Sequence, residues 1–208
     1  MPACRSGACR CGLKKRDSLA ARINIPNLLT WLRILLIPLV VGVFYTPDAW
    51  FGPAEKNQLA TFIFVLAAIT DWLDGWLARK LDQQSAFGAF LDPVADKLMV
   101  AAALVILVQL GRCDSIIALV IIGREIAISA LREWMAQLGR TRSVAVNALG
   151  KIKTIAQMIA IPLLLFHDNF MGLFEARVLG LWFIWAAALL TLVSMVWYIR
   201  AALPVARD

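Results

Sequence analysis

The sequence has few of the side chains that usually bind soft transition metals: one histidine and four cysteines among 208 residues. Three of the cysteines, Cys4, Cys9 and Cys11, lie in a basic N-terminal tail, where neither a histidine nor a fourth nearby cysteine completes a tetrahedral set. A metal site in this tail is therefore the weaker interpretation, and a poorly ordered, reduced tail is the stronger one. His167 and Cys113 fall on the predicted outer side, where we interpret them as a boundary residue and an inert thiol.

Charged residues are also scarce: they make up 17% of the chain, whereas hydrophobic residues make up 61% and the mean hydropathy is +0.75. A soluble domain has about 45–50% apolar residues, so this composition predicts an integral membrane protein. The net charge of +7 does not indicate a nucleic-acid-binding protein, because the basic residues cluster between apolar segments. Anionic lipid headgroups and phosphorylated small molecules are the expected partners.

No long linker, second domain or cleavable signal peptide is recognisable, since the N-terminal tail has no apolar segment of the signal-peptide kind. A helix of ~20 apolar residues crosses the hydrocarbon layer. We expect an all-α, polytopic membrane protein with six transmembrane helices. Residues 1–22 would form a disordered tail and residues 23–208 one membrane domain. The expected spans are residues 25–46, 57–79, 90–110, 115–137, 146–167 and 177–202.

The positive residues orient these spans. Lysines and arginines are dense before the first span, between the second and third, around the connection of the fourth to the fifth, and at the C-terminus. The opposite loops carry only Lys56, Arg112 and Arg177. By the positive-inside rule, both termini are expected on the cytoplasmic side, together with the adjoining ends of the second and third spans.

Four aspartates interrupt the apolar sequence at those ends. Asp71 and Asp74 are three residues apart and share one helix face, and Asp92 and Asp96 are four apart and share another. A carboxylate at bilayer depth costs at least ~2.5–3.5 kcal/mol, so such residues usually have a partner or a task. Oxygen ligands favour hard cations, Mg²⁺ or Mn²⁺ before Ca²⁺, and four carboxylates are enough to bridge two ions.

Each aspartate also has a simpler interpretation. Asp71 and Asp74 could be helix-end charges that reach water, and Asp92 could be an N-cap, because Pro93 follows it. Arg79 and Lys80 could be topology anchors alone. These separate explanations do not account for four carboxylates at helical spacing, so we favour the metal site.

The whole run reads D-x2-D-G-x2-A-R-x8-G-x3-D-x3-D and resembles the signature of the CDP-alcohol phosphotransferase family at every fixed position. Members of that family are six-helix membrane enzymes, usually homodimers, that displace CMP from a CDP-linked donor with an alcohol. The segments 24–33, 123–136 and 144–157 are similar to bacterial members that use sn-glycerol 3-phosphate. The residues of the signature are Asp71, Asp74, Gly75, Ala78, Arg79, Gly88, Asp92 and Asp96.

Carried over to this chain, the resemblance implies that all four aspartates hold divalent metal, Mg²⁺ or Mn²⁺ and two ions per site, with Asp96 as the favoured general base. It implies a transfer from CDP-diacylglycerol to sn-glycerol 3-phosphate that yields phosphatidylglycerophosphate and CMP at the cytoplasmic face of the bacterial inner membrane. The residues expected around the cytidine diphosphate are Gly75, Ala78, Arg79, Gly88, Asn27 and Thr30.

Glycerol 3-phosphate is a dianion, so its site should contain several cations. Arg124, Arg132, Lys151 and Lys153, on the fourth and fifth spans, are the candidates. The alternatives for these residues are intramembrane ion pairs, for example between Arg124 and a nearby acid, and topology alone.

Two other functions stay open at this point. A sibling transferase would use an inositol phosphate, serine or phosphatidylglycerol as acceptor. A divalent-cation transporter would line its path with the aspartates, although a transport site tends toward the bilayer midplane and these carboxylates cluster near one side.

Overall fold

The computed structural model describes residues 25–81, 86–138, 148–167, 169–170 and 174–202, so the tail of residues 1–22 lies outside it. Over these residues the chain forms six α-helices, one for each predicted span. The all-α class is confirmed there, apart from a two-residue strand pair between the last two helices. The elements are α1 (Ile25–Val43), α2 (Pro53–Leu81), α3 (Ala86–Gln109), α4 (Ser115–Gln137), α5 (Ala148–Phe166), β1 (Asn169–Phe170), β2 (Phe174–Glu175) and α6 (Ala176–Ala202).

Local sequence signals set several of these boundaries. Pro53 begins α2, as a proline in the first helical turn commonly does. Gly111 takes a φ of +67° in the turn after α3, a conformation that glycine adopts without strain. Asp114 caps α4, because its side chain accepts a hydrogen bond from the backbone N–H of Ile116 at 2.7 Å.

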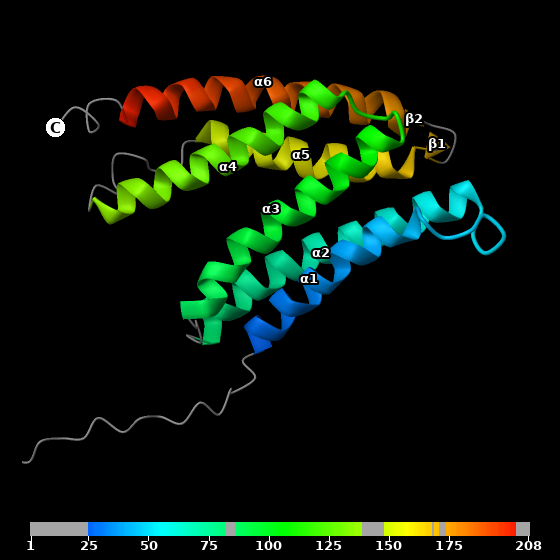
Figure 1. The fold of residues 1–208 in the computed structure, drawn as a ribbon, viewed down its shortest axis with the longest axis horizontal. Helices are drawn as coiled ribbons and strands as arrows, with labels where there is room; N and C mark the ends of the chain where they lie inside the picture. Colours follow the sequence, from blue (N-terminus) through cyan, green and yellow to red (C-terminus); the bar gives the residue numbers. More distant parts are fainter. Residues whose placement is uncertain (1–24, 82–85, 139–147, 168, 171–173, 203–208) are drawn as a thin grey trace, which may run out of the picture.

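The helices alternate in direction along the long axis of the molecule (Figure 1). The start of α1, the end of α2 and the start of α3 lie at the same end as the start of α5 and the ends of α4 and α6. In the packing, α1 contacts both α2 and α3, α5 contacts α2 and α6, and α4 contacts α6. The aspartate-bearing parts of α2 and α3 and the basic parts of α4 and α5 therefore share one end of the bundle.

The surface suits a lipid environment. Large apolar side chains such as Leu119 (71% exposed) and Trp182 (73% exposed) point away from the core. By length and composition, one helix of the described part, Ala176–Arg200, can cross a membrane, and Leu28–Val43 and Ile152–Phe166 are shorter apolar helices. Charged residues interrupt the apolar sequence of the others, which is why the topology of six spans stays a prediction.

At the opposite end, Arg112 ties three elements together. Its Nη1 donates to the carbonyl oxygens of Leu164 (3.2 Å) and Leu165 (2.7 Å) near the end of α5, and its Nη2 donates to Oδ1 of Asn57 on α2 (2.8 Å). The contact satisfies helix-end carbonyls that would otherwise lack a donor. Next to it, burial and the nearby Asp114 carboxylate raise the pKa of the Cys113 thiol to about 11. The inert thiol predicted at this position agrees with its burial and raised pKa.

Candidate active site

An arginine of α1 joins the two aspartate-bearing helices. Nη1 of Arg33 lies 2.7 Å from Oδ1 of Asp71 on α2 and 2.7 Å from Oδ1 of Asp96 on α3. The arginine side chain is 1% exposed, whereas the two carboxylates are 36% and 41% exposed. The two aspartate-bearing faces thus converge on one buried cation. Arg33 is not among the site residues that the sequence predicts.

The first helix also reaches the third aspartate. The hydroxyl of Thr30 donates to Oδ1 of Asp92 at 2.5 Å. Pro93 lies inside α3, seven residues after its start at Ala86, so the alternative interpretation of Asp92 as an N-cap is wrong. The sequence had suggested an N-cap because proline favours the first helical turn, but helices in membranes also tolerate proline in their interior. Thr30 and Arg33, one turn apart on α1, together hold Asp71, Asp92 and Asp96.

These carboxylates suit a divalent cation. Asp71 and Asp96 already direct oxygens at one positive charge, and carboxylate oxygens are the ligands that Mg²⁺ and Mn²⁺ prefer. The described side chains do not by themselves form a group of three metal ligands. The fourth aspartate, Asp74, belongs to α2, but its side chain lies outside the described part of the structure.

Other predicted residues are only partly covered. Gly88 is buried in α3. Asn27 of α1, Gly75, Ala78 and Arg79 of α2, and Lys151 of α5 fall in described helices, but their side chains lie outside the described part of the structure. Their roles therefore stay predictions.

A cavity of about 260 Å³ connects Asp96 with the basic residues of α4. Asp96 and Lys97 of α3 form part of its wall, Arg124, Glu125 and Arg132 of α4 form another part, and Thr154 and Gln157 of α5 complete it. The cavity thus brings the Asp96 carboxylate of α3 together with two guanidinium groups of α4, the next helix along the chain.

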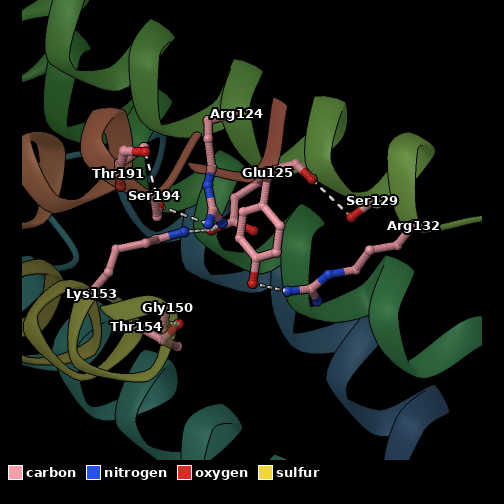
Figure 2. Close-up of polar contacts among 10 residues, drawn as sticks. Arg124, Glu125, Ser129, Arg132, Gly150, Lys153, Thr154, Thr191 and Ser194 are labelled. Carbon is pink, nitrogen blue, oxygen red and sulfur yellow. Dashed lines mark hydrogen bonds and ion pairs between the residues drawn. The ribbon is translucent and has the colours of Figure 1, made fainter. Parts of the chain in front are cut away.

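The cations around this cavity are held by defined partners (Figure 2). Lys153 of α5 is 1% exposed and forms an ion pair with Oε1 of Glu125, which also lies 3.7 Å from Nη1 of Arg124. The ion-pair alternative for Arg124 is therefore realised, although Lys153 is the closer partner of the glutamate. Because Lys153 neutralises Glu125, the guanidinium groups of Arg124 and Arg132 supply the excess positive charge of the α4 part of the wall.

Sequence reasoning missed the contribution of the last helix. Nη2 of Arg124 donates to Oγ of Ser194 at 2.9 Å, and Nη2 of Arg132 donates to Oη of Tyr198 at 2.8 Å. Both α6 residues are buried. One signal was available: Ser194 and Tyr198 are polar residues four apart on one face of a largely apolar helix.

A comparison of the sequence with models of known protein families identifies the family of this chain. A family described as CDP-alcohol phosphatidyltransferase matches residues 23–193. The chain belongs to this family, which confirms the resemblance carried by the aspartate signature.

Individual relatives cover nearly the whole chain. A Pseudomonas fluorescens protein named CDP-diacylglycerol–glycerol-3-phosphate 3-phosphatidyltransferase is 52% identical over 185 residues, which are 88% of this chain and 91% of that protein. Proteins of the same name from Salmonella choleraesuis (strain SC-B67) and Shigella flexneri serotype 5b (strain 8401) are 49% and 48% identical over 183 residues, 87% of this chain and 96% of each relative.

Proposed function

We propose that this protein is a phosphatidyltransferase that joins CDP-diacylglycerol and sn-glycerol 3-phosphate to give phosphatidylglycerophosphate and CMP. The observation that carries the proposal is the cavity that Asp96 shares with Arg124 and Arg132. It offers a proton acceptor and a site for a phosphate dianion within one space. The names of the relatives, at about half identity over most of the chain, support the same reaction.

In this mechanism the phosphate of the acceptor binds at Arg124 and Arg132, and Lys151 of α5 adds a further cation. Lys153, which is buried and paired with Glu125, would keep that carboxylate neutralised beside the phosphate. Arginine suits phosphate because its planar fork of donors matches two oxygens at once. Binding there would place the acceptor hydroxyl near Asp96, whose carboxylate accepts the proton as the hydroxyl oxygen attacks phosphorus. The new phosphorus–oxygen bond replaces the bond to CMP, which leaves.

The donor end would be held by the aspartate helices. Asp71, Asp74, Asp92 and Asp96 are the proposed ligands of two divalent ions, Mg²⁺ or Mn²⁺. When bound, such ions would neutralise the charge of the pyrophosphate and of departing CMP. Because Arg33 pairs with Asp71 and Asp96, it would lie beside the reacting phosphate and add positive charge there. The proposed cytidine diphosphate site consists of Gly75, Ala78, Arg79, Gly88, Asn27 and Thr30.

The arrangement in the cell follows from the same proposal. Residues 23–208 would form one domain of six transmembrane helices in the bacterial inner membrane, preceded by a tail of residues 1–22. The termini and the active site would face the cytoplasm, since the end that carries the aspartates also carries the dense lysines and arginines. A homodimer is part of the proposal on the basis of the family alone.

An acceptor panel tests the function. Purified protein in detergent is given CDP-diacylglycerol and glycerol 3-phosphate, serine, an inositol phosphate or phosphatidylglycerol, each with Mg²⁺, with Mn²⁺ and with a chelator, and CMP release is measured. We expect metal-dependent release with glycerol 3-phosphate. Release with another acceptor only would assign a sibling activity. No release from any pair, together with metal flux in proteoliposomes, would favour a transporter.

A further inference from the structure

The last helix supplies a hydroxyl partner to each arginine of the cavity wall. Ser194 and Tyr198 lie one turn apart on α6 and are 1% and 0% exposed. Arg124 donates to Ser194 at 2.9 Å and Arg132 donates to Tyr198 at 2.8 Å. Figure 2 shows Arg124 and Ser194 directed toward each other from their two helices. These contacts restrict how each guanidinium can turn.

The ring of Tyr198 contacts both arginines as well. Its centroid lies 5.7 Å from Cζ of Arg124 and 5.2 Å from Cζ of Arg132. Cations within about 6 Å of an aromatic face are attracted by it. The aromatic ring thus offsets part of the repulsion between two like charges that face one cavity.

The hydroxyl of Tyr198 is separable from the packing role of the ring. The ring packs with Ile128 and Met135 of α4, and it meets Trp197 edge to face at 5.4 Å. A phenylalanine would fill the same volume. The hydroxyl also has room at Gly150 of α5, where an added Cβ would lie 3.7 Å from Oη.

We propose that Tyr198 is a positioning residue for the acceptor phosphate: it orients Arg132, and with Ser194 it orients Arg124, toward the cavity that contains Asp96. Tyr198 does not line the cavity, so it would act through the two arginines. Guanidinium groups that are ordered before the substrate binds lose less conformational entropy on binding. This inference rests on the proposed use of glycerol 3-phosphate.

The test is Tyr198→Phe, which removes the hydroxyl and keeps the ring. The apparent KM for glycerol 3-phosphate should rise about 5- to 10-fold, the scale of one ordinary intramolecular hydrogen bond. The turnover number and the KM for CDP-diacylglycerol should stay at wild-type values. The inhibition constant of inorganic phosphate, which competes with glycerol 3-phosphate, should rise by the same factor. Tyr198→Leu, which also removes the ring, should raise the KM further, and Ser194→Ala should raise it through Arg124.

The chain offers a matched control, because its only other tyrosine is Tyr45. The Tyr45 hydroxyl donates to Gln109 at 3.2 Å at the far end of the bundle and is exposed, so Tyr45→Phe should leave every kinetic constant unchanged. If Tyr198→Phe lowers thermal stability and turnover but leaves the KM for glycerol 3-phosphate unchanged, the residue is structural and the inference is wrong. Wild-type kinetics in Tyr198→Phe would overturn it too. Failure of the proposed function is distinguishable, since the wild-type protein would then release no CMP with glycerol 3-phosphate.

Discussion

Replacing Arg33 by methionine should destabilise the protein, and the size of the loss depends on how exposed its partners Asp71 and Asp96 are. Loss of one partner from a fully buried ion pair costs about 3–5 kcal/mol, whereas an exposed pair contributes about 0–1 kcal/mol. Arg33 is 1% exposed, but Asp71 and Asp96 are 36% and 41% exposed, so water screens the carboxylates after the arginine is removed. We therefore expect a loss of about 2 kcal/mol, between those two limits.

The assay is thermal unfolding of the purified protein in detergent, followed by intrinsic fluorescence with a chelator and with Mg²⁺. A loss of about 2 kcal/mol corresponds to a decrease in Tm of roughly 4–8 °C for a chain of this length. Mg²⁺ should reduce the decrease, because a cation held by Asp71 and Asp96 would replace the lost positive charge. Arg177→Met, which changes an exposed arginine of α6, is the control and should leave the Tm nearly unchanged.

Two results would contradict this reasoning. A wild-type Tm for Arg33→Met in chelator would mean that the contacts with Asp71 and Asp96 contribute no stability. An equal decrease in Tm with chelator and with Mg²⁺ would mean that these two aspartates do not hold the metal.

Two further substitutions and one labelling experiment test other parts of the structure. Gly180→Ala should destabilise the protein by about 1–3 kcal/mol at the contact of α5 with α6, because the added Cβ would lie 2.8 Å from Cγ of Leu164. Gly42→Ala, which has open space around the added Cβ, is the control in the same unfolding assay. If the Gly180→Ala protein is as stable as the Gly42→Ala protein, the close approach of α5 and α6 at Gly180 is wrong. Asp92→Asn should abolish metal-dependent CMP release from protein that still folds, and near-normal activity would remove Asp92 from the metal site. Cys113, whose pKa is raised to about 11, should stay protonated at neutral pH and react only slowly with a maleimide. The reaction is measured in a chain whose other cysteines are replaced by serine, and its rate should increase as the pH rises toward 11. Fast labelling near neutral pH would contradict the burial of Cys113.

The helices and the grouping of the site were predictable because both depend on periodic patterns. Each of the six apolar segments became one helix, with boundaries within a few residues of those expected. The spacing of the aspartates fixed their faces, and charge placed their end of the bundle beside the basic residues of α4 and α5. Such patterns are local, so a single sequence carries them in full.

The contacts that organise the site could not be predicted in the same way. The link from Arg33 to Asp71 and Asp96 depends on α1 packing against both α2 and α3, and no local pattern encodes that neighbourhood. The same holds for Tyr198, whose hydroxyl meets a residue 66 positions away. The pairing of Lys153 with Glu125 was open, because a buried lysine can neutralise an acid or bind a phosphate and the sequence does not decide between them.

The central claim is that the acceptor hydroxyl attacks the lipid phosphate and releases CMP. Glycerol 3-phosphate labelled with heavy oxygen in its terminal hydroxyl, given with CDP-diacylglycerol and Mg²⁺, tests this directly by mass spectrometry of the products. We predict that the label appears in phosphatidylglycerophosphate and that CMP is unlabelled. Unlabelled lipid, or phosphatidic acid and CMP formed by hydrolysis, would contradict the claim.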